Sequence, residues 1–307
     1  MVNILLATYN GEKYIKQQIE SILSQSYKDF TLYIHDDGSK DGTIEKIKSF
    51  KDDRIQILED GICLHDSSLN FFHLMINQKE CDYFAFCDQD DIWESDKLQI
   101  QIDEMKELET RYSHIIPITL GTDLNLIDSQ GNEIGESMYH FQEINYNSTY
   151  FTQLYENSFT GCTMFMNWAV MNYILKLFEI KKQDSIIQHD WFIANICAAD
   201  GCIKQLHNKT VNYRQHENNV VGAQKTSLIK HIKDRKIFRT INKIKELKYR
   251  CNKQNEIVIT LINNEEKKRL TKKICNTSFL LHKYLIIKYK VIESVSLKKR
   301  LIKFLFY

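Results

Sequence analysis

Residues 83–91 read Tyr-Phe-Ala-Phe-Cys-Asp-Gln-Asp-Asp. The first five form a short apolar run rich in aromatic side chains, which predicts a buried strand. The carboxylates of Asp88, Asp90 and Asp91 follow directly and would repel one another strongly in a cleft that held no cation. Oxygen ligands suit a hard divalent ion such as Mg²⁺ or Mn²⁺. The alternative interpretation is an acidic loop that caps the next helix.

The first half of the chain alternates strand and helix patterns. We expect strands over residues 2–7, 31–35, 54–58 and 83–87, and helices over residues 12–24, from about 41, over 70–77 and over about 95–110. This alternation predicts an α/β fold with a mostly parallel sheet and helices on both faces. Because ligands of such sheets bind at the carboxyl ends of the strands, the polar residues 8–10, 36–37 and 88–91 should share one edge.

The second half is less regular. We expect a strand and a short hairpin over residues 115–135, a strand over 159–166, a helix over 190–199, and strands over 203–206 and 211–214. Residues 225–307 contain neither Gly nor Pro, and Ile and Leu recur there at helical spacing. This pattern predicts three or four amphipathic helices.

The formal net charge of +1 conceals a strong asymmetry. Residues 225–307 carry 23 Lys and Arg against 6 Asp and Glu, whereas residues 1–224 carry 18 against 34. One interpretation of the basic tail is that its apolar faces pack on the main domain and its lysines are solvated. A second, compatible one is that its basic face docks on an anionic membrane surface. Nucleic acid is not expected, because the aromatic residues do not interleave as a base-stacking platform.

A hydrophobic content of 43% and a charged content of 26% are ordinary for a folded protein. The eight cysteines form no CxxC pair and lie mostly in apolar runs, so they predict a reducing compartment and no zinc site. No apolar stretch approaches the roughly 20 residues that span a bilayer. We therefore expect a cytoplasmic protein.

Five motifs follow one another along the chain: Ala-Thr-Tyr-Asn-Gly-Glu at residues 7–12, Asp-Asp-Gly-Ser-Lys-Asp-Gly-Thr at 36–43, Asp-Gln-Asp-Asp-Ile-Trp at 88–93, His-Asp-Trp at 189–191, and Tyr-Arg-Gln-His-Glu-Asn-Asn-Val-Val-Gly at 213–222. In this order they resemble the family-2 glycosyltransferases of the GT-A fold, in particular bacterial rhamnosyltransferases that build cell-wall or capsular polysaccharide. The resemblance implies a catalytic domain over residues 1–224. Its nucleotide-sugar part covers about 1–110, its acceptor part covers about 111–224, and a basic amphipathic helical region covers 225–307.

The resemblance implies an enzyme, a hexosyltransferase that uses a dTDP- or UDP-linked sugar donor. Asp37 would accept a hydrogen bond from the N3–H of the pyrimidine, with Asp36 as its helper. Asp88 would hold the ribose or a metal-bound water. The full set implied for the donor nucleotide is Thr8, Tyr9, Glu12, Asp36, Asp37, Asp88 and Gln89.

A divalent cation, Mg²⁺ or Mn²⁺, is implied as the cofactor. Asp90 would bind it directly, and Asp88 and Asp91 are further candidate ligands. His216 would complete the metal site or contact the diphosphate, and Arg214 would pair with a phosphate. The ion would bridge the diphosphate and neutralise charge as the sugar–phosphate bond breaks.

Asp190 is the implied general base, which deprotonates the acceptor hydroxyl. It lies in the first turn of an expected helix, where the dipole favours an anion, so we expect its pKa to be low and its effect to come from position. N-terminal capping of that helix is the alternative role. The pocket for the sugar or acceptor would be formed by Gly161, Cys162, His189 and Trp191.

The implied function is inverting transfer of L-rhamnose from dTDP-L-rhamnose to a lipid-linked or saccharide acceptor in cell-wall or capsular polysaccharide synthesis. A UDP-hexose or UDP-N-acetylhexosamine transferase is the alternative of the same fold. A phosphotransferase would need an aspartate after the first strand, where this chain has Thr8, Tyr9 and Asn10. A catalytically inactive scaffold docked on the membrane is the alternative of a different class.

No QxxRW-type segment follows, so a processive synthase is not expected. The tail would hold the enzyme on the inner face of the cell membrane, and the sequence indicates no oligomeric state.

Overall fold

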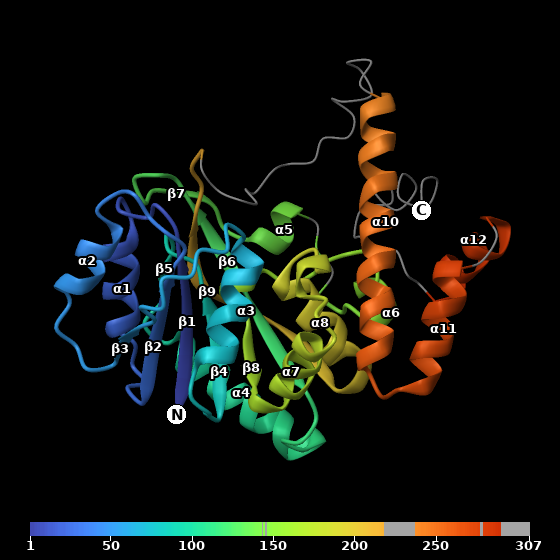
Figure 1. Cartoon of the computed structure of the whole chain (residues 1–307), viewed down its shortest axis with the longest axis horizontal. Coiled ribbons are helices and arrows are strands. Elements are labelled where there is room, and N and C mark those ends of the chain that lie inside the picture. The colour runs from blue at the N-terminus through green and yellow to red at the C-terminus, as the bar shows by residue number, and fades with distance from the viewer. Residues whose placement is uncertain (143, 145, 218–236, 277–278, 290–307) are drawn as a thin grey trace.

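The computed structural model describes residues 1–142, 144, 146–217, 237–276 and 279–289. A nine-stranded mixed sheet runs through this part of the chain in the order β3-β2-β1-β4-β8-β6-β9-β5, with β7 paired to β6 (Figure 1). Most of the residue pairs between neighbouring strands join strands that run parallel, which confirms the predicted α/β class. The strands are β1 (Val2–Thr8), β2 (Phe30–Asp36), β3 (Ile55–Ile57), β4 (Tyr83–Cys87), β5 (Ile92–Trp93), β6 (Ile118–Ile127), β7 (Glu133–Gly135), β8 (Phe165–Asn167) and β9 (Cys202–Arg214).

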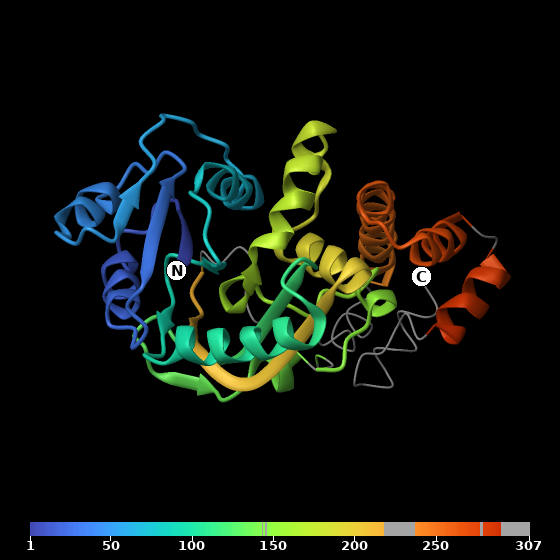
Figure 2. The ribbon, with the colours of Figure 1, turned by 90° about the horizontal axis from the view of Figure 1, so that it is seen from below.

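Helices cover both faces of the sheet. On one face lie α1 (Ile15–Leu23), α2 (Thr43–Ser49) and α4 (Lys97–Tyr112), and on the other lie α3 (Ser67–Asn77), α7 (Met171–Glu179) and α8 (His189–Asp200). Figure 2 shows α3 and α7 on the side of the strands away from α4. The shorter elements are α5 (Met138–Gln142), α6 (Tyr150–Gln153) and the 3₁₀ helices η1 (Gly161–Thr163), η2 (Trp168–Val170) and η3 (Gln183–Ser185).

The side chains of β1 explain why both faces are covered. Leu5 packs with Phe86 of the neighbouring β4 in one apolar cluster, whereas Ile4 and Leu6 pack in the other cluster with Ala85. All five residues are fully buried. Burial of each large side chain contributes about 1.5–3 kcal/mol relative to exposure, so a strand that is apolar on both sides needs helices on both sides.

The parallel strands β2, β1 and β4 end at a common edge. Their register places Thr8 opposite Asp36 and Leu6 opposite Cys87. Asp37 and Asp88 come directly after these strand ends. The polar residues after the three strands therefore share one edge, as the sequence predicts.

Two predictions for the second half are wrong. The strand predicted over residues 159–166 is replaced by η1, and only Phe165–Asn167 is extended. The chain turns there with two i→i+3 hydrogen bonds, in which the N–H of Thr163 donates to the carbonyl of Thr160 and the N–H of Met164 donates to the carbonyl of Gly161, both at 2.9 Å. The two strands predicted over 203–206 and 211–214 are one strand, β9, because register shifts against β6 beside Asp123 accommodate the polar stretch between them.

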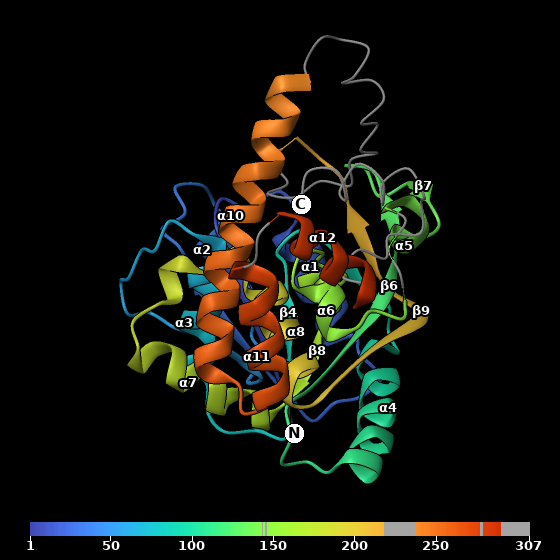
Figure 3. The ribbon, with the colours of Figure 1, turned by 90° about the vertical axis from the view of Figure 1, so that its right-hand side faces the viewer.

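Three helices follow in the C-terminal region: α10 (Ile237–Leu261), α11 (Glu265–Asn276) and α12 (Phe279–Lys288). They stand together at the end of the molecule opposite α2 (Figures 1 and 3). Val258, Ile274 and Leu285 belong to the same apolar cluster as Phe192 of α8. The prediction that apolar faces of the tail pack on the main domain is confirmed for these three helices.

Polar contacts also join the tail to the main domain. The Nζ of Lys267 donates to the carbonyl oxygens of Ala198 and Ala199 at 2.8 and 2.7 Å, where a cation complements the C-terminal end of α8. Among the described residues, no helix combines the length and the apolarity needed to cross a membrane. The domain boundary at residue 224 stays a prediction, and the calls on residues 218–236 and 290–307 lie outside the described residues.

Candidate active site

A cavity of about 1780 Å³ opens at the carboxyl edge of β1, β2 and β4. The loops after these strands, the first turn of α8 and the residues after β9 contribute to its walls. The predicted site residues that line it are Thr8, Tyr9, Asp37, Asp88, Gln89, Asp90, Gly161, His189, Asp190 and His216. The structure thus brings together residues that are up to about two hundred positions apart in the chain.

The two aspartates at the end of β2, Asp36 and Asp37, have different surroundings. The carboxylate of Asp36 accepts hydrogen bonds from Thr8 Oγ1 at 2.9 Å and from the N–H of Ser39 at 2.8 Å, so it shapes the turn and does not line the cavity. Asp37 lines the cavity, is only 5% exposed and accepts a hydrogen bond from the N–H of Leu64. The predicted nucleotide contacts of Asp36 and Asp37 both stay predictions, and of these two residues Asp37 lines the cavity.

Gln89 joins the acidic tetrad to the loop after β1. Its Oε1 accepts from the N–H of Tyr9 at 2.9 Å, and its Nε2 donates to the carbonyl of Tyr9 at 3.0 Å. A Cβ at Gly11 would lie 2.2 Å from Gln89 Oε1, so this approach requires a glycine. The clamp presents the Tyr9 ring, 48% exposed, at the cavity wall.

Like charges gather around the tetrad. Burial, and then the charges of Asp90 and Asp190, raises the pKa of Asp88. Burial, and then Asp90 and Asp88, raises the pKa of Asp91 as well. His216 Nε2 lies 2.8 Å from Asp90 Oδ2, and its ring stacks on Tyr14. Cationic side chains beside these carboxylates are Arg214, which bonds to the carbonyl of Asp90, and the buried Lys97, which lies near Asp91.

Carboxylate ligands suit a hard divalent cation. Asp88, Asp90 and His216 line the cavity and offer two carboxylates and one imidazole, whereas the neighbouring group whose ligand atoms lie within 4.8 Å of one another is Asp88, Asp91 and Cys162. Asp91 is fully buried and is not among the residues that line the cavity. A divalent ion would relieve the repulsion that raises the pKa of Asp88 and Asp91.

Arg214 is not among the residues that line the cavity, and its predicted phosphate contact stays a prediction. It is 1% exposed, and its guanidinium donates to the carbonyl of Asp90 at 2.8 Å and to Gln17 Oε1 at 2.7 Å. It also donates to the carbonyls of Asp128 and Ser129. The five fixed donors of an arginine suit this set of acceptors, so Arg214 positions the tetrad from behind.

Asp190 lies in the first turn of α8 and lines the cavity. Its carboxylate accepts hydrogen bonds from the N–H of Trp191 at 2.6 Å, the N–H of Gly161 and the amide of Asn157. Burial nevertheless raises the pKa of Asp190 to about 6. The prediction of a low pKa is wrong, because removal of the carboxylate from water outweighs the helix dipole and the three donors.

His189 is a neutral wall residue beside Asp190. Burial lowers the pKa of His189 to about 3, and its ring stacks on Phe71 at 4.2 Å between ring centroids. Among the described residues, neither ring nitrogen has a hydrogen-bond partner. A Cβ at Gly161 would lie 3.1 Å from His189 Nε2, so the glycine makes room for this ring.

Three further predicted site residues are not among those that line the cavity, and their predicted contacts stay predictions. Glu12 accepts from the N–H of Gly42 at 3.1 Å and so supports the turn into α2. Trp191 is 4% exposed and donates its indole N–H to the carbonyl of Gln153. Cys162 is fully buried beneath the tetrad.

Two residues that the sequence does not single out belong to the site. Asn157 lies in the loop between α6 and η1 and donates to Asp190. Arg250 comes from α10, so the basic tail contributes a cation to the cavity wall. Neither residue lies in a motif; only their tertiary positions identify them.

Residues 3–170, more than half of the chain, match the model of Glycosyl transferase family 2. The chain belongs to this family. It is a glycosyltransferase, as its motifs predict. Its relatives include the dTDP-rhamnosyl transferase RfbG of Shigella flexneri, 30% identical over 237 residues, which are 71% of this chain and 74% of that protein.

Shorter matches reach two Escherichia coli family members. The enzyme WfgD, a UDP-Glc:alpha-D-GlcNAc-diphosphoundecaprenol beta-1,3-glucosyltransferase, is 33% identical over 105 residues, 34% of this chain and 41% of that protein. WfaP, of the same described activity, is 34% identical over 114 residues, 37% of this chain and 45% of that protein. The chain thus spans less than half of either glucosyltransferase.

The solved structure of TarS residues 1–349 from S. aureus in complex with UDP-GlcNAc has a similar fold. The TM-score is 0.54 at 13% sequence identity, over 93% of this chain and 78% of that chain. This likeness confirms the predicted GT-A architecture of this glycosyltransferase.

Proposed function

We propose that this glycosyltransferase moves L-rhamnose from dTDP-L-rhamnose, with inversion, to a lipid-linked or saccharide acceptor in polysaccharide synthesis. The convergence of Asp90 and Asp190 on one cavity carries the proposal of transfer at this site. The Shigella relative, a dTDP-rhamnosyl transferase that matches 71% of this chain, supports the choice of donor.

Asp190 acts as the general base. With a pKa of about 6 it is ionised at neutral pH, yet it is more basic than an aspartate in water. It takes the proton of the acceptor hydroxyl, whose oxygen attacks the anomeric carbon while the diphosphate leaves from the opposite face. One displacement inverts the configuration, and the donors from Gly161 and Asn157 hold the carboxylate in place.

Asp88, Asp90 and His216 hold the cofactor, Mg²⁺ or Mn²⁺. When bound, the ion neutralises the diphosphate and stabilises the charge that develops on it. Arg214 and Gln89 keep these ligands in place through the backbone of Asp90 and of Tyr9.

The donor nucleotide lies on the wall formed by Thr8, Tyr9 and Asp37. The exposed ring of Tyr9 offers a face on which a pyrimidine stacks. The buried carboxylate of Asp37 accepts the N3–H of uracil or thymine, which cytosine lacks. Both dTDP and UDP donors satisfy this contact.

The acceptor enters past Arg250 and Lys13, whose side chains line the cavity and favour an anionic group. A diphosphate-linked lipid is such an acceptor, and the names of the two Escherichia coli relatives specify one. The same two relatives favour the second candidate, a glucosyl transfer from UDP-glucose.

A donor panel tests the proposal. Purified protein is incubated with dTDP-L-rhamnose, UDP-glucose and UDP-N-acetylglucosamine, each with Mg²⁺ or Mn²⁺ and each with EDTA, and released nucleotide is measured. We expect release of dTDP that depends on the divalent cation, and we expect EDTA to prevent product formation. Release of UDP alone would contradict rhamnosyl transfer and favour the second candidate, a transfer from a UDP-sugar. An absence of turnover with every pyrimidine-nucleotide donor would contradict the whole proposal.

A further inference from the structure

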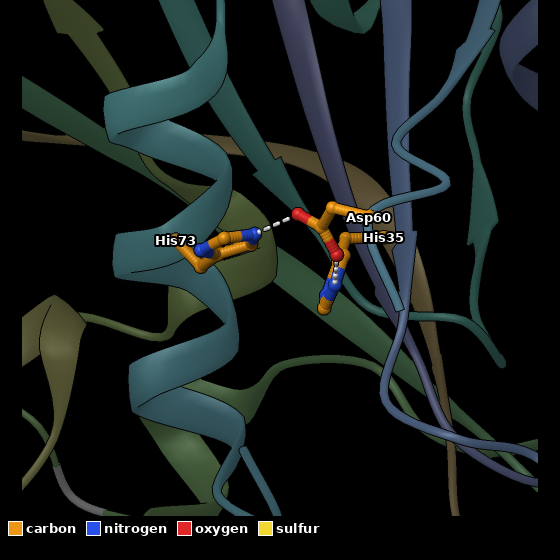
Figure 4. Close-up of side chains that lie close together, drawn as sticks. All are labelled: His35, Asp60 and His73. Atoms are coloured by element: carbon orange, nitrogen blue, oxygen red, sulfur yellow. Dashed lines mark hydrogen bonds and ion pairs between the residues drawn. The ribbon is translucent and has the colours of Figure 1, made fainter. Parts of the chain in front are cut away.

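Three side chains that sugar transfer does not use meet behind the nucleotide wall (Figure 4). His35 comes from β2, Asp60 from the segment after β3, and His73 from α3. Their ligand atoms all lie within 4.8 Å of one another. His73 Nε2 is 2.6 Å from Asp60 Oδ2, and His35 Nε2 is 3.4 Å from Asp60 Oδ1, so both rings face one carboxylate.

The hydrogen bond that His35 makes through Nδ1 decides whether its Nε2 can donate to Asp60. His35 Nδ1 lies 2.7 Å from Asn70 Oδ1, while Asn70 Nδ2 lies 3.5 Å from the carbonyl of His35. Because the amide oxygen only accepts, Nδ1 carries the proton, and Nε2 of a neutral ring then has a lone pair. That lone pair faces Asp60 Oδ1, another acceptor. Two arrangements resolve the conflict: a proton on Nε2, which makes an ion pair with Asp60, or a metal ion between the two atoms.

The environment of the cluster suits a metal ion. The exposed fraction of the side chain is 1% for His35, 11% for His73 and 34% for Asp60, so an ion has protein on most sides and an open path on one. The bond from His35 to Asn70 repeats the pattern in which a metal-bound imidazole donates its other N–H to an oxygen.

We propose that His35, Asp60 and His73 bind one Zn²⁺, with water in the fourth position. Zinc–ligand bonds of about 2.0–2.1 Å give a tetrahedral edge of roughly 3.3–3.4 Å. The distance from His35 Nε2 to Asp60 Oδ1, 3.4 Å, matches that edge. Binding replaces the proton between His73 Nε2 and Asp60 with the ion, and that proton is released to solvent.

The site clamps residues 58–66, the segment that joins β3 to α3. In this segment the N–H of Leu64 donates to Asp37, and His65 and Asp66 line the active-site cavity. Asn70, which bonds to His35, lines the cavity as well. Zinc would therefore fix the wall beside the nucleotide position without taking part in transfer. Cysteine spacing gives no indication of this site, because it uses none.

Metal analysis of the full chain tests the proposal. Asp88→Asn protein is used, because Asp88 belongs to the other described group of candidate ligands, Asp88, Asp91 and Cys162, and Asp90→Asn is combined with it so that the tetrad does not compete for zinc. The protein is stripped with EDTA and dialysed against micromolar Zn²⁺ with millimolar Mg²⁺. We expect one zinc per chain and a rise in Tm of about 5 °C at saturating zinc. X-ray absorption at the zinc edge should show imidazole ligands. Zinc that is absent, or bound without imidazole, would overturn the proposal.

Two variants and a control locate the ion. In this doubly substituted background, His73→Gln and Asp60→Asn should each lose the zinc and the Tm rise, whereas His114→Gln, an exposed histidine after α4, should keep both. Retention of zinc in both cluster variants would also overturn the proposal. Far-ultraviolet circular dichroism checks folding, and the X-ray absorption of the parent protein decides the matter if either variant misfolds. The donor panel is independent of this result, so failure of one proposal leaves the other standing.

Discussion

At the scale of single residues, Asp190 shows how position and burial oppose each other. The helix dipole and three hydrogen-bond donors favour its ionised form, yet burial raises the pKa of Asp190 to about 6. A base is active only when deprotonated, and its strength increases with its pKa. The structure thus makes Asp190 a better base than its place at a helix terminus suggests.

This pKa sets the pH dependence of transfer. Because the deprotonated form of Asp190 is active, kcat/KM should be low below pH 6, increase as pH rises through about 6, and level off above it. Initial rates with saturating cation, measured across this range, provide the profile. A profile that stays flat through this range, or falls as pH rises through about 6, would contradict the role of Asp190.

At the scale of elements, the buried Arg214 holds three segments together. Its guanidinium bonds to the carbonyl of Asp90, to Gln17 on α1 and to the turn between β6 and β7. Arg214→Lys keeps the charge but removes donors, which leaves buried carbonyls without partners at about 1–3 kcal/mol each.

We therefore expect Arg214→Lys to lower the free energy of unfolding by about 2–4 kcal/mol and to weaken cation binding. Urea unfolding and titration with Mn²⁺ measure the two effects. The matched control is Arg111→Lys on α4, an exposed residue paired only with Glu107 in the described contacts, which should cost less than about 1 kcal/mol. Equal effects of the two substitutions would refute the positioning role of Arg214.

The same elements show what the sequence can and cannot predict. The strands that end at Thr8, Asp36 and Cys87 are strongly apolar, so their common edge follows from pattern and parallel topology. The segment at 159–166 is apolar too, but a short apolar run does not distinguish a strand from a 3₁₀ turn around a glycine. Whether an arginine contacts a ligand or backbone carbonyls depends on the fold of distant segments, and for that reason the sequence does not predict the carbonyl contacts of Arg214.

At the scale of the whole molecule, α10 connects the basic tail to the site. Arg250 on α10 lines the cavity, unlike the other basic residues that the structure describes on α10, α11 and α12. We expect Arg250→Ala to raise the KM for a diphosphate-linked acceptor about 10-fold or more, with kcat and the KM for the donor little changed. Arg269→Ala, at an exposed position of α11, is the control and should change neither constant. An equal effect on acceptors without phosphate would argue against an anionic contact.

The remaining basic residues of the tail support a second prediction at this scale, that the protein binds anionic membranes. Lys272 and Lys273 are exposed on α11, and each basic residue near such a surface contributes about 1 kcal/mol. Lys272→Glu with Lys273→Glu should weaken binding to anionic vesicles by about 30-fold or more. Lys28→Glu with Lys106→Glu, at exposed positions in the first half of the chain, is the matched control. Vesicle co-sedimentation at two salt concentrations measures the affinity of each variant for the vesicles. Equal binding of the parent protein to neutral and anionic vesicles would contradict binding to anionic membranes.

The proposed mechanism requires that Asp90 and Asp190 act at one centre in different steps. Calorimetric titration with the nucleotide-sugar donor and Mn²⁺, together with single-turnover transfer, separates binding from chemistry. Asp190→Asn should bind the donor with affinity close to that of the parent protein and lose at least about 100-fold in transfer. Asp90→Asn should lose cation-dependent donor binding and transfer together. If Asp190→Asn transfers sugar at the parent rate, or Asp90→Asn still binds the donor in a cation-dependent way, the two carboxylates do not form the active site described here.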